Sequence, residues 1–393
     1  MLKEKDVSRL LSWYREKKRD LPWRHTPDAY KIWVSEIMLQ QTRVEAVKPY
    51  YAAFLKKSPD VTKLANAKEE ELIRIWEGLG YYSRVRNMHK AAVEVTLNHG
   101  GFFPVSYEVL LTLPGIGEYT AGAVASIAGG ENVPAVDGNV LRVYTRVCAN
   151  EGEISNSKVV KEIREELRSV MKAAGKKESG EKTAGKKTAG KKSAGKSATE
   201  KKDAAKKAVF EEIYSPGDFN SAMMELGATV CLPNGEPKCE SCPFSKICLA
   251  KKQGNMTEYP KKAPAKKRKI EERTVFILES TKGIALKKRP EKGLLAGMYE
   301  FPAKSGYLSR KEAVEFVKSL GYHPLSVKRI EDAKHIFSHM EWHMQAYYVS
   351  VDAILDPEKE DPENGIIFVT KKERMEGFAL PSAFETYKKY IFR

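Results

Sequence analysis

Leu113-Pro114-Gly115-Ile116-Gly117-Glu118-Tyr119-Thr120-Ala121-Gly122 is a short turn between two stretches of helical periodicity, residues 105–112 and 119–128. The glycines at 115 and 117 permit a tight hairpin whose backbone N–H groups can approach a bound anion. The second helix would begin beside them, and the positive end of a helix dipole favours phosphate. The sequence therefore predicts a helix-hairpin-helix element that contacts a nucleic-acid backbone, although a Pro-Gly turn between helices also occurs without a ligand.

The sequence on both sides of this turn is helical in pattern. Apolar residues recur at helical spacing from Val7 to about Val170, and again over residues 209–248. Beyond residue 270 the pattern changes to short alternating strands such as Thr274–Leu278, with one helical stretch at Arg310–Leu320.

This change of pattern predicts a multidomain protein. We expect an all-α domain over residues 1–253, a basic linker over 254–270, and a small α+β domain with a mixed sheet over 271–393. A chain of 393 residues is longer than a single hydrophobic core usually supports, which also favours two domains.

Four of the five cysteines lie close together, in the pattern Cys231-x7-Cys239-x2-Cys242-x5-Cys248. Thiolates at such mixed short spacings are typical of iron-sulfur clusters. Zinc is the alternative, but structural zinc sites usually use two short CxxC-like pairs, and this loop has one. A disulfide framework is a weaker interpretation, because nothing in the sequence indicates export. We therefore expect these four cysteines to hold an iron-sulfur cluster.

The formal charge of +16 comes almost entirely from two segments. Residues 172–207 contain 13 Lys and 4 acidic residues in repeats such as TAGKK, and residues 261–269 (KKAPAKKRK) add +6. The first segment has almost no large apolar side chain to bury, which predicts a disordered arm. Such an arm could hold DNA loosely through salt-dependent contacts, or could be a solvated insertion without a role. Net charge alone therefore does not identify nucleic acid as the ligand.

The first twenty residues are charged throughout and lack the apolar core of a signal peptide. No stretch has the length of apolar sequence that a membrane-spanning helix needs. We therefore expect no membrane association. The expected location is cytoplasmic and nucleoid-associated, or nuclear in a eukaryote, where KKAPAKKRK would suit an import signal as well as a linker.

Two carboxylates are candidates for catalysis. Glu36 lies in WVSEIMLQQT (33–42) with mostly apolar neighbours, so desolvation should raise its pKa and let it hold a proton near neutral pH. Asp137 lies in PAVDGNV (134–140), where a helix start favours the ionised form. An exposed helix residue and a plain N-cap are the structural alternatives. When the environment shifts the pKa values of two acids in opposite directions, one can act as a proton donor and the other as an anion.

Several segments together resemble a known family: SEIMLQQTRVEAVKPYY, EGLGYYSRVRNMHKAA, LPGIGEYTAGAVASIA, AVDGNVLRVYTR and FNSAMMELGATVC. With the cysteine loop, they resemble the adenine DNA glycosylases of the MutY family, within the endonuclease III superfamily. GLLAGMYEFP and HIFSHMEWH extend the resemblance into the second domain, which looks like the Nudix-like recognition module of that family. Two features depart from the family: the first cysteine gap is one residue longer than usual, and the 172–207 arm lies outside the pattern.

The resemblance implies catalytic roles at matching positions. Glu36 would protonate adenine at N7, and Asp137 would stabilise the oxocarbenium-like sugar until water adds. Tyr119 and Asn139 would help to hold that intermediate. Lyase-competent relatives carry a lysine where this chain has Tyr119, and a phenol cannot form their Schiff base. The resemblance therefore implies a monofunctional hydrolase, with core packing as the alternative for Tyr119.

The resemblance also implies how DNA is held. Gln41 and Tyr81 would enter the base stack when adenine is extruded, and the hairpin glycines Gly115 and Gly117 would contact the DNA. The extruded adenine would lie against Trp23 and Arg24, for which packing in the core is the alternative.

In the C-terminal domain, Phe337, Ser338 and His339 match the family's loop at 8-oxoguanine. Ser338 would recognise the oxidised base by hydrogen bonding, and the other two would shape the loop. The stretch RKEAVEFVKSLG (310–321) keeps only two acids, so Mg²⁺-dependent nucleotide hydrolysis is not expected.

These inferences predict a base-excision-repair adenine DNA glycosylase with a 4Fe-4S cluster. It would act as a monomer on double-stranded DNA containing adenine opposite 8-oxoguanine or, less well, guanine. One alternative is a bifunctional endonuclease III-like glycosylase and lyase for oxidised pyrimidines, against which Tyr119 argues. A noncatalytic iron-sulfur DNA-binding protein is another, and it would need neither Glu36 nor Asp137.

Overall fold

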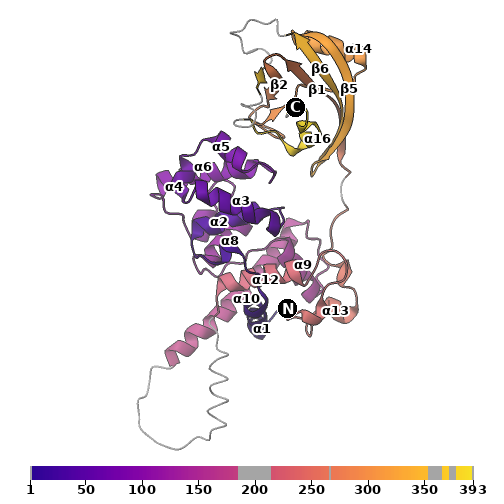
Figure 1. Ribbon diagram of the computed structural model, residues 1–393. Coiled ribbons are helices and arrows are strands. Elements are labelled where there is room, and N and C mark those ends of the chain that lie inside the picture. The colour runs from indigo at the N-terminus through magenta and orange to yellow at the C-terminus, as the bar shows by residue number, and fades with distance from the viewer. Residues whose placement is uncertain (1, 185–213, 265–266, 353–364, 371–377, 392–393) are drawn as a thin grey trace, which may run out of the picture. The chain divides into compact units, whose positions relative to one another are not determined.

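The computed structural model describes residues 2–184, 214–264, 267–352, 365–370 and 378–391. The chain divides into two compact units, Met1–Tyr51 with Pro59–Thr62 and Ala91–Pro264, and Ala52–Ser58 with Lys63–Lys90 and Ala265–Arg393. Figure 1 shows the helices of the N-terminal part and the strands of the C-terminal part. This division groups residues 63–90 with the residues of the sheet. The predicted boundaries, 1–253, 254–270 and 271–393, follow secondary structure instead, and they stay a prediction.

The described chain before residue 269 contains helices and loops and no strand, as the apolar spacing predicts. No helix in the described ranges is both long and apolar enough to cross a membrane. The helical elements are α1 Glu4–Lys17, η1 Pro22–Arg24, α2 Ala29–Leu39, α3 Val44–Lys57, α4 Val61–Ala65, α5 Glu69–Ile75, α6 Ser83–Asn98, α7 Tyr107–Leu110, α8 Glu118–Ile127, α9 Gly138–Cys148, α10 Ser157–Ala184, α12 Pro216–Thr229, η2 Cys239–Ser241, α13 Leu249–Gln253 and η3 Met256–Glu258.

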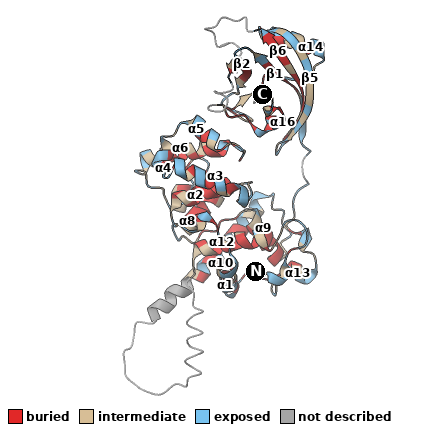
Figure 2. Cartoon of the chain, viewed as in Figure 1, coloured by how far each residue is buried: buried red, intermediate tan, exposed pale blue. Residues whose placement is uncertain are grey.

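The core of the helical unit forms where α1, α9, α10 and α12 bury their apolar faces together. Leu10, Tyr144, Leu167 and Phe219 meet in this core, and buried residues run along α9 and α12 in Figure 2. Helices α9 and α12 approach closely at Gly227. A Cβ atom added to Gly227 of α12 would lie only 2.5 Å from Cβ of Asn139 on α9. A larger residue at 227 would push α9 away and move Asn139 with it.

The helix α10 continues to Ala184, so residues 172–184 of the predicted disordered arm are helical. This part of the prediction is wrong, because Ala and Lys are good helix formers and can extend a helix that the core has already nucleated. The rest of the expected arm, residues 185–207, lies outside the described residues.

A mixed sheet forms the C-terminal part, as predicted. Its strands follow the order β3-β2-β1-β6-β5, with β4 paired to β1 and β7 paired to β2. β1 and β6 are parallel, whereas the other pairs are antiparallel. The elements are β1 Lys269–Ser280, β2 Gly283–Lys288, β3 Tyr299–Glu300, β4 Ala303–Ser305, α14 Arg310–Ser319, β5 His323–Ile336, β6 Met340–Asp352, β7 Ile366–Val369, η4 Ser382–Phe384 and α16 Glu385–Lys388.

Both faces of this sheet are covered. Alternate residues of β1 point to opposite faces, so Val275 packs in the core that contains Tyr387 of α16, and Phe276 packs in the core that contains Val317 of α14. The antiparallel strands β5 and β6 are joined by residues 337–339, which places the predicted lesion-reading loop at the tip of a hairpin.

Candidate active site

One cavity of about 290 Å³ lies where α1, η1, α2, α8, α9 and α12 meet. Its volume is near the lower end of the range for small-ligand pockets, about 300–1,000 Å³. All four predicted catalytic residues and both predicted adenine-pocket residues line it: Trp23, Arg24, Glu36, Tyr119, Asp137 and Asn139. Residues more than a hundred positions apart in sequence therefore line the same cavity.

Glu36 lies on α2 and is only 6% exposed. Burial raises its pKa to about 7, with a further increase from Asp137, while hydrogen bonding to Tyr119 lowers it. The expected desolvation of this acid is confirmed, and the alternative of an exposed helix residue is excluded. At neutral pH a carboxyl group with this pKa is protonated in a large fraction of molecules.

Tyr119 lies in the first turn of α8 and donates a hydrogen bond from its hydroxyl to Glu36. The same oxygen lies 3.4 Å from Sδ of Met224. Burial raises the pKa of Tyr119 well above its usual value, and the neighbouring carboxyl groups of Glu36 and Asp137 raise it further. The phenol therefore keeps its proton and points it at the acid, which is more than core packing requires.

Asp137 caps α9, accepting hydrogen bonds from the backbone N–H of Val140 (2.8 Å) and from Nδ2 of Asn139 (2.6 Å). Burial nevertheless raises the pKa of Asp137, although these hydrogen bonds lower it. The prediction that the pKa values of Glu36 and Asp137 shift in opposite directions is therefore wrong, because burial raises both. The local contacts favour the anion as predicted, but desolvation inside the cavity outweighs them.

Arg142, one turn further along α9, fixes Asn139 in place. Its Nη2 donates to Oδ1 of Asn139 (2.9 Å) and to the carbonyl of Gly227 (2.8 Å), and its Nε donates to the carbonyl of Cys231 (2.7 Å). The sequence analysis missed this residue. The spacing from Asn139 to Arg142 on one helix face was the available signal.

The wall beside Trp23 contains an ion network that the sequence analysis also missed. Glu225 of α12 is 1% exposed and accepts from Arg19 (2.7 and 2.8 Å) and from Nη2 of Arg24 (2.8 Å). Burial acts to raise the pKa of Glu225, but the hydrogen bonds from Arg19 and Arg24 more than offset it, so the pKa lies below its ordinary value. Trp23 is 7% exposed and packs edge-on against Tyr51. An ionised Glu225 thus holds both guanidinium groups at the cavity.

Gln41 and Tyr81, predicted to enter the DNA stack, share an unusual backbone conformation. Their φ angles are +58° and +48°, in the left-handed region that side chains other than Gly rarely adopt. Both are exposed, and Tyr81 is 45% exposed despite its size. Strained, exposed positions of this kind are concentrated at functional sites.

The hairpin at residues 113–117 has the predicted form. Gly115 has a φ angle of +75°, and Gly117 is the N-cap of α8 without a side-chain cap. A Cβ atom at Gly117 would meet nothing within 4 Å, so the space beside the first N–H groups of α8 is open. The helix N-terminus is therefore accessible to an anion.

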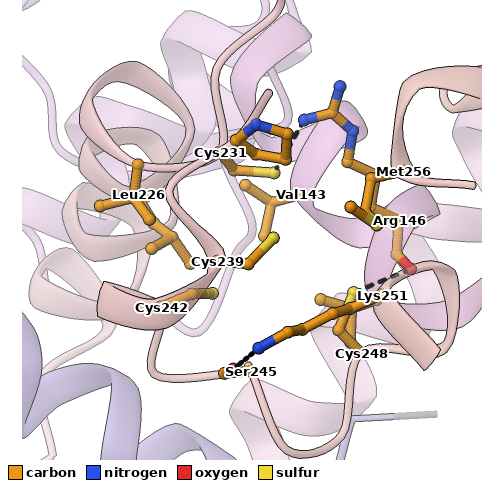
Figure 3. Close-up of a pocket in the computed structure, with 13 residues that line it drawn as sticks. Val143, Arg146, Leu226, Cys231, Cys239, Cys242, Ser245, Cys248, Lys251 and Met256 are labelled. Carbon is orange, nitrogen blue, oxygen red and sulfur yellow. Dashed lines mark hydrogen bonds between the residues drawn. The ribbon is translucent and has the colours of Figure 1, made fainter. Parts of the chain in front are cut away.

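All four predicted cysteines line a second, smaller pocket of about 20 Å³, shown in Figure 3. Arg146 of α9 donates from Nη1 to Sγ of Cys231 (3.3 Å), and Lys251 lies on the other side of the pocket. Burial raises the pKa values of Cys239, Cys242 and Cys248, to about 12 for Cys242. Buried thiolates need compensating positive charge, so this donor set with two nearby cations fits an iron-sulfur cluster.

The long first gap in the cysteine pattern is accommodated by a turn. Gly235 has a φ angle of +71°, and a Cβ atom there would meet nothing within 4 Å. Lys238 then returns to the protein through a hydrogen bond from its N–H to the carbonyl of Val230 (2.9 Å). The segment between Cys231 and Cys239 therefore turns at the exposed pair Asn234-Gly235, where glycine permits the positive φ angle.

Phe337, Ser338 and His339 lie together at the β5–β6 hairpin tip. Ser338 and His339 are exposed, with Oγ of Ser338 3.4 Å from Nδ1 of His339. Phe337 is half-buried and packs edge-on against Trp342, with ring centroids 4.9 Å apart. The aromatic ring anchors the loop, and the two polar side chains remain available to a ligand.

The two acids of the helix at 310–321 are engaged in local structure. Glu312 forms the capping box of α14 with Ser309, and Glu315 pairs with Lys318. The part of the chain that the structure describes contains no group of three or more His, Cys, Asp or Glu side chains that could hold a single metal ion.

Comparisons with known proteins match both parts of the chain. The family of HhH-GPD superfamily base excision DNA repair proteins matches residues 34–169, and the NUDIX domain family matches residues 274–390. A solved structure of a thermostable thymine-DNA glycosylase matches with 25% identity and a TM-score of 0.48, over 63% of this chain and 95% of that chain.

Curated relatives match over most of the chain. The human adenine DNA glycosylase is 33% identical over 403 residues, covering 87% of this chain and 66% of the human protein. The mouse adenine DNA glycosylase is 32% identical, covering 88% of this chain and 70% of the mouse protein. This chain thus spans about two thirds of the length of its mammalian relatives. The chain belongs to the adenine DNA glycosylase family, whose members are base excision repair enzymes of the HhH-GPD superfamily.

Proposed function

We propose that this protein hydrolyses the N-glycosidic bond of adenine opposite 8-oxoguanine, and less well opposite guanine, in double-stranded DNA. It leaves an abasic site and does not cut the strand. The observation that carries this proposal is the meeting of Glu36, Tyr119, Asp137 and Asn139 in one cavity, with the pKa of Glu36 raised to about 7.

The proposed reaction uses the two acids in sequence. Glu36 gives its proton to N7 of the extruded adenine, and the electron pair of the C1′–N9 bond moves into the base, which leaves as neutral adenine. Asp137, held by Val140 and Asn139, stabilises the cationic sugar that remains. Water then adds to C1′, and the proton that it releases restores Glu36.

The partner is DNA that contains the mispair. Adenine enters the cavity beside Trp23 and Arg24, and Gln41 and Tyr81 fill the gap that it leaves, while the open N-terminus of α8 contacts the backbone. The loop at 337–339 contacts 8-oxoguanine. We propose that the protein acts as a monomer in the cytoplasm or nucleus, wherever the DNA is.

The cofactor is a 4Fe-4S cluster held by Cys231, Cys239, Cys242 and Cys248. These four cysteines would hold the cluster, which would cross-link residues 231–248 and so stabilise the segment that follows α12. Arg146 and Arg142 both donate to this loop and both lie on the helix that Asp137 caps. Iron and sulfide analysis of the purified protein, and of Cys239→Ser, tests this assignment; a colourless wild-type protein containing zinc would overturn it.

An alkali-dependent cleavage assay tests the activity. The protein is incubated with one duplex carrying adenine opposite 8-oxoguanine and another carrying thymine glycol opposite adenine, each with and without subsequent alkali. We expect scission of the first duplex alone, and only after alkali. Scission without alkali would support the bifunctional rival, and binding without any excision would support the noncatalytic one.

Lys18 allows a test between the hydrolase and the lyase mechanisms. It is the lysine among the described residues that line the cavity, and its Nζ lies 5.2 Å from the ring centre of Tyr14. A Schiff-base mechanism on this wall would need that amine. For a hydrolase, Lys18→Ala should retain adenine excision and leave the alkali requirement unchanged.

A further inference from the structure

The hairpin tip at 337–339 is supported by a row of side chains across the sheet. In the register of β1, β6 and β5, Trp342 lies beside Glu271 on one side and His335 on the other. Arg273 follows on the same face of β1, because alternate residues of a strand share a face. Trp342 therefore lies between the loop and Arg273, whose side chain is 13% exposed.

Aromatic contacts fasten the loop to this row. The ring of Phe337 meets Trp342 edge-on (4.9 Å, 74°) and His335 edge-on (4.6 Å, 67°). The N–H of Phe337 donates to the carbonyl of Met340 (2.8 Å), which closes the hairpin. Ser338 and His339 have no comparable packing and project from an anchored residue.

Two guanidinium groups lie against the indole of Trp342. The Cζ atoms of Arg273 and Arg289 are 4.2 Å and 5.6 Å from the ring centre. Glu300 holds both: Arg289 donates to it, and Nη2 of Arg273 lies 3.7 Å from its Oε2. The three charged side chains are 12–16% exposed, so the cation–π contact is largely desolvated and strong.

The indole itself has an unmet requirement. Trp342 is 1% exposed, and among the described residues its Nε1 has no hydrogen-bond partner. A phenylalanine would fill this position without burying an unpaired donor. What the indole adds is the larger π face, which binds guanidinium groups better than the faces of Tyr or Phe.

We infer that Trp342 and Arg273 are positioning residues that set the preference for 8-oxoguanine over guanine. By clamping Phe337, they present Ser338 and His339 in one geometry to the base opposite the adenine. This inference rests on the proposed function of the loop. It adds a specificity role for two residues that do not themselves contact the lesion.

The test is the ratio of single-turnover adenine excision rates opposite 8-oxoguanine and opposite guanine. It is measured for the full-length wild type, Trp342→Phe, Arg273→Met and Arg273→Lys. We expect roughly a tenfold fall in the ratio for Arg273→Met, an effect between those of an exposed and a fully desolvated cation–π contact. The ratio should fall because excision opposite 8-oxoguanine slows, while excision opposite guanine is unchanged. The ratio should fall less in Arg273→Lys and Trp342→Phe.

Phe276→Leu is the matched control, because Phe276 is a buried aromatic residue of β1 that packs on the opposite face of the same sheet. The inference is overturned if the ratio is unchanged in Arg273→Met, if both rates fall in parallel, or if Phe276→Leu lowers the ratio equally. Thermal melting of each variant shows whether a fall in both excision rates comes from unfolding. A wild type without any preference overturns the proposed function as well, whereas a wild-type preference that persists in the variants overturns this inference alone.

Discussion

The cavity of the helical unit and the loop of the sheet unit place their polar residues under opposite conditions of solvent. Glu36 is 6% exposed and its pKa is raised to about 7, whereas Ser338 and His339 are exposed. Proton transfer to a purine benefits from a buried acid, because burial brings its pKa to the working pH. Recognition of a base needs side chains that a ligand can reach. Helix packing around the cavity therefore positions the catalytic acid Glu36. Packing of Phe337 positions the neighbouring recognition residues Ser338 and His339.

The largest expected effect tests the buried half of this comparison. Glu36→Gln removes the proton donor and should slow excision about 10²–10⁴-fold while DNA binding persists. Glu45→Gln is the control, because Glu45 is an exposed acid of α3 paired with Lys48. Single-turnover rates and binding titrations measure the two properties. Full activity in Glu36→Gln would show that burial of this acid has no catalytic purpose.

Asp137→Asn separates the charge of this residue from its role as a cap. Asparagine caps a helix as well as aspartate does, so the melting temperature should change little. Excision should slow on the order of 10²-fold, because the cationic sugar loses its anionic partner. If melting falls and excision per folded molecule does not, Asp137 is an N-cap and the cavity contains a single catalytic acid.

The pH dependence of excision sharpens the argument from burial. Protonated Glu36 is the active form, so the rate should fall as the pH rises through about 7. The hydrogen bond from Tyr119 lowers this pKa, so Tyr119→Phe should move the midpoint to higher pH. Single-turnover excision rates of the wild type and of Tyr119→Phe, measured across a range of pH on both sides of 7, provide the test. A midpoint that moves to lower pH would contradict the assigned direction of this hydrogen bond.

The smallest expected effect lies at the exposed loop. Ser338→Ala should lower excision opposite 8-oxoguanine about two- to tenfold, the value of one hydrogen bond, and leave excision opposite guanine unchanged. Ser326→Ala is the control, because Ser326 is an exposed serine of β5 outside the loop. Equal losses on both substrates would show that the loop contacts DNA without distinguishing the lesion.

Local features of the fold were predictable because they depend on neighbours in sequence. The hairpin at Gly115 and the cap at Asp137 follow from turn and capping chemistry, and the structure has them. The alternation expected for Thr274–Leu278 is wrong in burial, because both faces of the sheet are covered and all five residues are buried. The extent of α10 was not predictable in this way, since the composition of residues 172–184 suits both a disordered arm and the continuation of a helix.

Part of the site was also beyond sequence reasoning. Glu225 is an ordinary acid in a helical stretch until it meets Arg19, 206 residues earlier in the chain. Trp342 and Arg273 are likewise an aromatic and a basic residue of separate strands. Only the parallel pairing of β1 and β6 brings them together.

The amino-acid sequence by itself determined where a helical region gives way to strands, which cysteines lie close together, and which two acids are candidates for catalysis. The tertiary structure decided that those acids share a cavity with Tyr119, and that burial outweighs the helix cap in setting the pKa of Asp137. The physical reason is that periodicity and capping act over a few residues. Desolvation and charge interaction depend on what packs nearby, and distant parts of the chain supply those neighbours.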